Sequence, residues 1–192
     1  MATRNQVDLG LSGSTGTGTF VGANTPTLIT PVIGAATATS VVFNPTTGGI
    51  IGTTTNDNAN AGSVGEFVSS VILLSGTPVV LSTGTPADLT SISLTAGDWD
   101  VFGNVSFLPL SAGTVISQVQ NWISSTSATS PDPALVNSIT APATGAGTAT
   151  AFNAPTMRFS LGSTTTIYIS AVATFSVSGL EMIGAIYARR VR

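Results

Sequence analysis

The sequence predicts an all-β protein: an antiparallel β-sandwich that follows an extended N-terminal arm. Its composition favours strands and loops, because charged residues are only 7% of the chain and much of the polar remainder is Thr, Ser, Gly and Asn. Beyond residue 56, runs that alternate apolar and polar residues recur between short breaks rich in Gly and Pro. About eight strands joined by short turns are typical of a sandwich.

The clearest run extends from Thr90 to Pro109 and predicts a strand, a tight turn and a second strand. Gly97 suits the turn because glycine readily adopts a positive φ. Alternation in the second strand separates two faces, one with Trp99, Val101, Gly103, Val105 and Phe107, the other with Asp98, Asp100, Phe102, Asn104 and Ser106. We expect these two strands to form a hairpin, which needs a larger sheet and a second layer to be stable.

Residues 1–55 predict an extended arm that forms no core of its own. Pro26 and Pro31 exclude a helix, and residues 35–43 predict at most one strand. The arm is either a plain linker or a docking segment. Docking is favoured because large apolar side chains are costly to leave in water. The candidate docking residues are Phe20, Leu28, Ile29, Val32, Ile33 and Phe43.

The turn cluster at 56–62 predicts a boundary, so that residues 56–192 form a globular knob. We expect strands at 66–74, 78–82, 89–95, 99–108, 114–124, 156–161, 165–175 and 180–190. The first is ambiguous, since its apolar residues also fit a helical stripe, although β-branched side chains favour a strand. The long break at 126–155 contains four Pro residues and predicts an exposed loop, where recognition sites are common.

The last predicted strand is apolar on both faces. Met182, Gly184 and Ile186 lie on one face, and Ile183 and Tyr187 lie on the other. Phe102 likewise points away from the face that carries Trp99. Strands that are apolar on both faces are buried on both. In a sandwich of this size only another subunit can cover the outer face, so the sequence predicts an interface there.

The overall charge argues against a general nucleic-acid binder. The formal net charge is −3, Lys is absent, and such binders need a basic field. No apolar run approaches the ~18 residues of a membrane helix, and no secretion signal is visible. A chain with neither His nor Cys cannot hold a Ser-His-Asp or Cys-His site. A carboxylate-pair glycosidase remains formally possible, although eight acidic residues leave few candidates. No cofactor is expected.

Several polar groups have both a functional and a simpler interpretation. Asp98 and Asp100 share one side of a strand and could bind Ca²⁺ or act as acid and base, but a turn cap and a solvated face explain them more simply. The cluster from Asn56 to Asn60 offers oxygen ligands for Ca²⁺, but their spacing matches no known calcium-binding loop. Trp99 and Trp122 could stack on sugars. Trp99 is expected in the core, and Trp122 is the more open case.

Three of the five Arg residues lie within the last four positions: Arg189, Arg190 and Arg192. One interpretation is a solvated, solubilising tail. The other is contact between subunits or with a capsid, through paired hydrogen bonds to carboxylates. Both interpretations remain open from the sequence. Together with the apolar outer face, the residues expected at a subunit interface are Phe102, Ile183, Tyr187, Arg189 and Arg190.

Four segments carry a resemblance to a known group of proteins: TGTGTFVGANTPTLITPVIGAATATSVVF, GTTTNDNANAGSVGEFVSS, LTSISLTAGDWDVFGNVSF and GAIYARRVR. They resemble virion proteins of tailed bacteriophages, found among capsid decoration (cement) proteins and tail-fibre-like proteins. Residues 95–101 and 188–192 are the most specific. The turn at 96–98 is also similar to that of trimeric jelly-roll knobs of the tumour-necrosis-factor and complement (TNF/C1q) type.

The resemblance implies a homotrimeric jelly-roll knob attached to a virion by its N-terminal arm. With only about 55 residues before the knob, it implies a non-enzymatic decoration protein on the outer surface of the head, made in the host cytoplasm. The major capsid protein would be its partner besides the other copies of the chain. A short tail fibre or receptor-binding knob that recognises a host surface glycan or receptor is the alternative.

Overall fold

The computed structural model describes residues 55–140 and 148–192. Contacts divide the chain into two units, Met1–Gly52 and Thr53–Arg192, and the described residues all belong to the second. The predicted docking residues, from Phe20 to Phe43, lie outside the described part of the chain.

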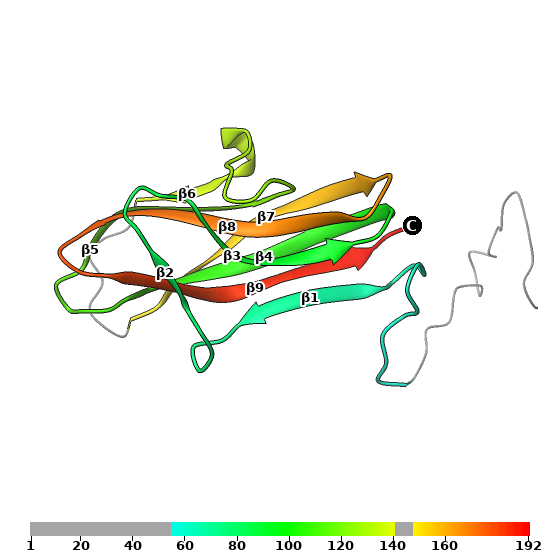
Figure 1. Ribbon diagram of the computed structural model, residues 1–192, viewed down its shortest axis with the longest axis horizontal. Coiled ribbons are helices and arrows are strands. Elements are labelled where there is room, and N and C mark those ends of the chain that lie inside the picture. The colour runs from blue at the N-terminus through cyan, green and yellow to red at the C-terminus, as the bar shows by residue number, and fades with distance from the viewer. Residues whose placement is uncertain (1–54, 141–147) are drawn as a thin grey trace, which may run out of the picture. The chain divides into compact units, whose positions relative to one another are not determined.

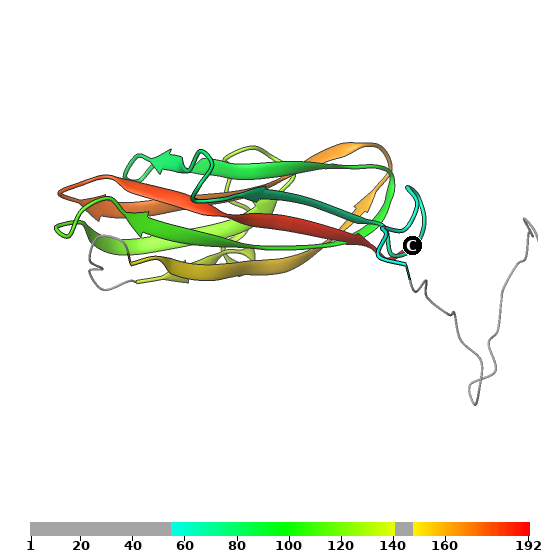
Figure 2. The same cartoon turned by 90° about the horizontal axis from the view of Figure 1, so that it is seen from below.

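Two antiparallel sheets pack face to face, which confirms the predicted all-β sandwich (Figures 1 and 2). One sheet, here called sheet A, has the order β1-β9-β4-β7, and β2 also pairs with β9; sheet B has the order β3-β8-β5-β6. The strands of sheet A are β1 (Phe67–Ile72), β2 (Val79–Leu81), β4 (Gly97–Pro109), β7 (Thr150–Leu161) and β9 (Leu180–Arg190). Those of sheet B are β3 (Ala87–Leu94), β5 (Val115–Ser124), β6 (Asn137–Ile139) and β8 (Thr165–Ser176).

The chain passes from one sheet to the other at almost every turn after β2, with β5 and β6 as the exception. This alternation is the winding of a jelly roll. It also corrects the predicted hairpin at residues 90–109, because β3 pairs with β8 whereas β4 pairs with β7 and β9. The turn near Gly97, where φ is +139°, therefore carries the chain across the sandwich.

The two faces of β4 are as the alternation predicted. Trp99, Val101, Val105 and Phe107 are buried between the sheets, and Phe102 is exposed on the outside. Gly103 allows the two sheets to approach, because a methyl group there would collide with the Ala185 carbonyl and lie 2.8 Å from the end of Ile169. The core is the apolar layer between sheets A and B.

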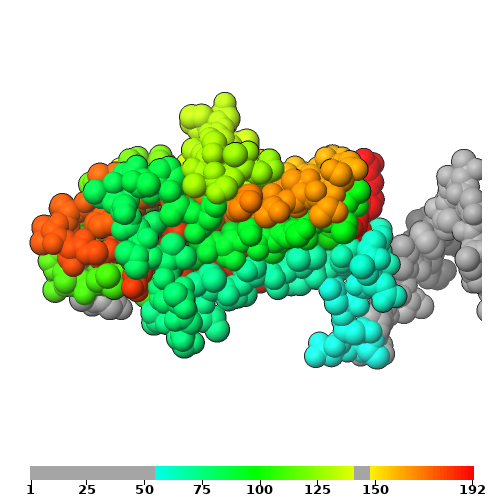
Figure 3. Space-filling view, in the orientation of Figure 1, coloured from blue at the N-terminus to red at the C-terminus, as the bar shows by residue number. Residues whose placement is uncertain are grey.

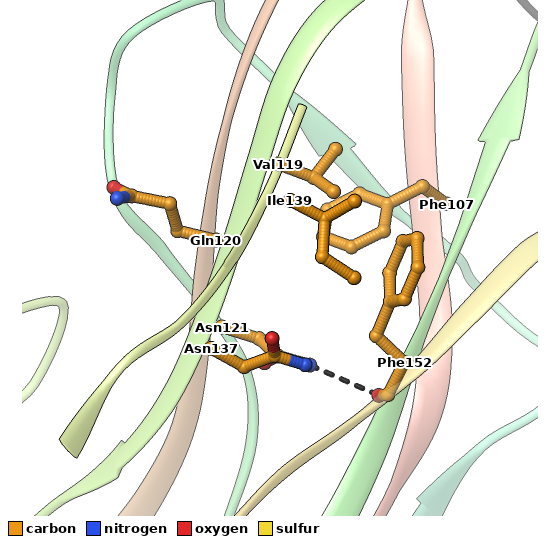
Figure 4. Close-up of a pocket in the computed structure, with 7 residues that line it drawn as sticks. All are labelled: Phe107, Val119, Gln120, Asn121, Asn137, Ile139 and Phe152. Carbon is orange, nitrogen blue, oxygen red and sulfur yellow. Dashed lines mark hydrogen bonds between the residues drawn. The ribbon is translucent and has the colours of Figure 1, made fainter. Parts of the chain in front are cut away.

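Polar side chains connect the two sheets at both edges of the sandwich. At one edge the hydroxyls of Ser70 (β1) and Thr90 (β3) lie 2.6 Å apart. At the other, Asn121 donates to the Phe152 carbonyl at 3.0 Å, beside the packed side chains of Phe107 and Ile139 (Figure 4). The gap within this cluster has no room for a water molecule. Neither of these two hydrogen bonds involves a charged residue.

The predicted strand boundaries needed correction in the long break at 126–155. Residues 133–135 form a short 3-10 turn, residues 137–139 form β6, and β7 begins at Thr150, well before the predicted start at residue 156. The first half of β7 was not predicted, because Pro155 interrupts its strand pattern. The proline is tolerated because β7 is an edge strand with a register shift between its Ala154 and Met157 pairings. The ambiguous segment at 66–74 is a strand, β1.

Candidate subunit interface

Three aromatic rings form a row across the outer face of sheet A. Tyr187 of β9 lies in the middle, with its ring centre 5.5 Å from that of Phe102 on β4 and 5.8 Å from that of Phe67 on β1. The rings are nearly parallel, with interplanar angles of 28° and 27°. Cross-strand register explains the contact, since Phe102 lies directly opposite Tyr187. We call Phe67, Tyr187 and Phe102 the aromatic row.

The aromatic row is only partly covered by its own chain. Phe102 is 38% exposed, Phe67 42%, and Val71, on the same face of β1, 47%. Ile183 is partly buried and lies on this face of β9. The face therefore presents a contiguous apolar surface across three adjacent strands, which a lone subunit leaves in contact with water.

A hollow of about 240 Å³ lies beside the aromatic row, towards β7. Phe102 and Tyr187 form one side, and Asn104, Asn153 and Thr156 contribute uncharged polar groups. Charged groups of sheet A lie near the ends of its strands: Arg189 is opposite Asp100 at one end, and Glu181 is opposite Leu108 at the other. The middle of the face thus combines the aromatic row with uncharged polar groups, a composition suited to burial.

The structure places the predicted interface residues unequally. Phe102, Ile183 and Tyr187 lie together on the outer face of sheet A, and Arg189 is exposed at its end. Phe67 was not predicted at the interface, because the apolar residues of 66–74 also fit a helix and the outward face of a strand there was not assigned. The alternation Phe67, Ser69, Val71 was the signal that could have found it, since it matches the outer face of β1.

Arg190 does not lie on the outer face, where the prediction placed it. Its side chain is buried inside the subunit and is only 4% exposed. Its Nε donates to Glu66 at 2.8 Å, and its Nη1 donates to the Ala96 carbonyl at 2.8 Å. Burial alone would raise the pKa of Glu66, but the bonds from the Gly62 N–H and from Arg190 together hold that pKa below its ordinary value. Arg190 therefore fastens the start of β1 to the turn before β4.

Asp98 is not the solvated residue that the simpler interpretation of the sequence expected. It is 2% exposed and forms ion pairs with Arg158, at 2.9 Å, and with Arg192. The hydrogen bond from Arg158 holds the pKa of Asp98 below its ordinary value, against the opposing effect of burial. Of the C-terminal arginines, Arg190 and Arg192 thus have partners within the subunit.

The other candidate sites find structural explanations. The side-chain amide of Asn58 pairs with the backbone of Phe67, donating at 2.7 Å and accepting at 2.9 Å, and so caps the edge of β1. Within residues 55–140 and 148–192, no three acidic side chains gather as a metal site would require. Trp99 and Trp122 are both fully buried, so neither presents an open ring face. The same residues include no helix long and apolar enough to cross a membrane.

No protein-family model matches this chain, and no curated protein matches it. Similar solved structures include the VP2 subviral particle of infectious bursal disease virus, with a TM-score of 0.42 and 10% identity over 66% of this chain and 32% of that one. A rhinovirus-B5 structure gives a TM-score of 0.35 and 11% identity over 92% of this chain and 96% of that one. This chain thus spans about a third of the VP2 chain. TM-scores below 0.5 establish no relationship, so function is inferred from this chain's own geometry.

Proposed function

We propose that this chain is a non-enzymatic structural protein of a tailed-bacteriophage virion. In this proposal its sandwich assembles as a homotrimeric knob, and residues 1–55 attach the knob to the outer surface of the head. The resemblance of the sequence to phage decoration proteins supports the virion assignment. The single observation that carries the assembly is the half-exposed aromatic row on the outer face of sheet A.

The aromatic row favours self-association for an energetic reason. Buried apolar area contributes roughly 25 cal/mol per Å², so completing the burial of Phe67, Phe102 and Val71 stabilises an assembly over separate subunits. Aromatic residues are enriched at the buried centres of interfaces and charged residues are depleted there. The neutral middle of this face has that composition. A net charge of only −3 over 192 residues adds little repulsion between copies.

The mechanical role follows from the arms. Three arms on one rigid knob bind neighbouring capsid subunits with avidity, even where each contact is weak. A protein that binds only the assembled head stabilises the head by linkage, because local opening must first release it. The function we propose is therefore to hold joints between capsid subunits closed.

The oligomeric state tests the assembly directly. We expect a trimer of the 19.1 kDa chain in sedimentation analysis. Phe102→Asp, which places a charge in the aromatic row, should yield folded monomers. Ser93→Asp, on the exposed outer face of sheet B, should leave the trimer intact. Wild-type protein that remains a monomer at micromolar concentration would remove this proposal.

The attachment role is tested by truncation. Protein that lacks residues 1–55 should remain a soluble trimer but should no longer coat empty heads, whereas the full chain should coat them. If the truncated trimer coats the heads equally well, the arm is not the docking segment.

A receptor-binding knob is the second candidate. A hollow on the outer face of sheet B favours it, because that face lies opposite the aromatic row and stays open in the proposed trimer. Purified protein should then adsorb to host cells and block infection. Infection that is indifferent to excess protein would count against this candidate.

A further inference from the structure

The outer face of sheet B carries a hollow that has no part in the proposed assembly. It has a volume of about 280 Å³ and lies over β5 and β8. Gln118, Gln120 and Trp122 contribute from β5, Val172 and Thr174 contribute from β8, and Ser130 contributes from the loop that follows β5. The size is close to the lower end of the range for small-molecule sites, roughly 300 Å³.

The lining of this hollow is polar but uncharged. Its amides and hydroxyls come from Gln118, Gln120, Ser130 and Thr174, and no residue that lines it is acidic or basic. Val172 adds apolar surface, and Trp122 borders the hollow but is fully buried. An apolar wall with a few hydrogen-bonding groups is the usual composition of a ligand site. The absence of charge in the lining selects against ionic ligands and favours a neutral ligand with many hydroxyl groups.

The two glutamine amides are held in place from outside the hollow. Ser138 on β6 accepts hydrogen bonds from Gln118 Nε2 at 3.1 Å and from Gln120 Nε2 at 3.2 Å. Within residues 55–140 and 148–192 neither amide has a further partner, so each carbonyl and each second amide hydrogen stays available. Side chains that are positioned before binding lose less entropy when a ligand arrives. The hollow therefore presents preorganised donors and acceptors.

Asp88 fixes the loop that supplies Ser130. Its carboxylate accepts bonds from the Ser127 hydroxyl at 2.6 Å, from the Ala128 N–H at 2.7 Å and from the Ser170 hydroxyl at 2.6 Å. In Figure 3 the loop and the 3-10 turn after it stand out from the outer face of the sandwich. Asp88 is thus a positioning residue for one wall of the hollow.

Trp122 provides a second, independent sign of a missing partner. Its ring is fully buried, and its Nε1–H has no acceptor among the described residues. Folded proteins rarely leave a buried donor unpaired, so such a group calls for an explanation. Trp122 borders the hollow, so this unpaired N–H belongs to the same part of sheet B.

We propose that this hollow binds one unit of a neutral sugar, with Gln118, Gln120 and Thr174 as its hydrogen-bonding residues and Val172 as its apolar wall. This inference rests on the second candidate above, the receptor-binding knob, and deepens it by naming the class of ligand and the residues that would bind it. Assembly and ligand binding are compatible, because the outer faces of sheets A and B lie on opposite sides of the sandwich (Figure 2).

The full chain should be titrated with neutral hexoses, N-acetylhexosamines and their oligomers, with saturation-transfer NMR and tryptophan fluorescence as readouts. At least one sugar should bind saturably. The double variant Gln118→Ala/Gln120→Ala should bind it at least about tenfold more weakly, because two hydrogen-bonding groups are removed. Asp88→Ala should also weaken binding, by loosening the wall. Thr166→Ala, on the same face of β8 but outside the hollow, should bind normally.

Two results would overturn the sugar site: no saturable binding of any neutral sugar, or binding that survives Gln118→Ala/Gln120→Ala unchanged. Sedimentation of the same variants separates this outcome from a failure of the assembly. The glutamine variant should remain trimeric whether or not the sugar site exists, since neither residue lies on sheet A.

Discussion

The guanidinium carbon of Arg190 lies 4.2 Å from the centre of the Trp99 ring, inside the end of the sandwich where β9 finishes. The same guanidinium bonds Glu66, Thr95 and the Ala96 carbonyl. Backbone bonds join Gly65 and Glu66 to Arg190 as well, at 3.0 and 2.9 Å. One side chain thus connects the residues before β1, the crossing turn before β4 and the last strand.

Replacing Arg190 should destabilise the sandwich strongly. Arg190→Ala leaves Glu66 as an unpaired, largely buried carboxylate, which typically costs about 3–5 kcal/mol of unfolding free energy. Arg189→Ala is the matched control, because the neighbouring side chain is exposed and its loss should change stability by less than about 0.5 kcal/mol. Urea denaturation measures both. Equal, small effects would show that the buried pair contributes nothing.

Stability should fall in acid because of Glu66 and Asp98. Both carboxyls have a folded-state pKa below the ordinary values of 4.5 and 3.8, so the unfolded chain binds protons more readily than the folded one. Their contribution is fully present above the ordinary values and is lost as the pH falls through the lower folded-state pKa. Urea midpoints should therefore be flat from pH 7 to about pH 5 and decline below about pH 4.5.

A variant identifies the source of that decline. Glu66→Gln removes one of the two titrating carboxyls, so its stability at neutral pH should be lower and its loss on acidification smaller. Glu181→Gln is the control, because the Glu181 carboxylate forms no ion pair among the described residues. Its stability should follow the wild-type profile. A Glu66→Gln profile as steep as that of the wild type would exclude Glu66 as a contributor.

The crossing turn should tolerate only glycine at position 97. Gly97 has φ of +139°, and a methyl group there would collide with the guanidinium of Arg190. Gly97→Ala should cost at least about 1–3 kcal/mol from the backbone alone, with the collision in addition. Gly84→Ala separates the two effects, because Gly84 also has a positive φ, +71°, but has open space around it. Thermal unfolding should rank Gly97→Ala as clearly less stable than Gly84→Ala.

The loop on sheet B should loosen when Asp88 is removed. In Asp88→Ala the Ala128 N–H and the Ser127 hydroxyl lose their acceptor, so the amide of Ala128 should exchange with deuterium faster. Hydrogen-exchange mass spectrometry of peptides that span residues 125–136 measures this. Asp57→Ala, whose carboxylate accepts a hydrogen bond from the Thr55 hydroxyl, should leave these peptides unchanged. Unchanged exchange in Asp88→Ala would mean that other contacts hold the loop.

The sequence indicated most strands of the knob because alternation is a local property. The inward face of β4 and the extent of β9, Leu180–Arg190, agree with the prediction. The pairing of β3 with β4 was wrong, since alternation says which face a residue takes but not which sheet its strand joins. The first half of β7 was missed because a proline tolerated only at an edge strand interrupts its pattern.

The candidate interface was predicted in part. The sequence showed that Phe102 on β4 and Tyr187 on β9 are aromatic residues on the face opposite the core. In the structure their rings stack. Phe67 joined them only through the register of β1 against β9. Alternation places Arg190 on the same face of β9 as Met182 and Ile186, so its inward direction was available from the sequence. Its partner Glu66, 124 positions away, could not be anticipated.

By itself the sequence determined that this protein is a β-sandwich with apolar residues on both faces of its closing strand, because local periodicity and the scarcity of charge fix those properties. Only the tertiary structure decided which partners its few charges have. Arg190 and Glu66 are 124 positions apart in the chain, and Arg158 and Asp98 are 60 apart. Contacts over such separations depend on how the strands wind between two sheets, and no local pattern encodes that winding.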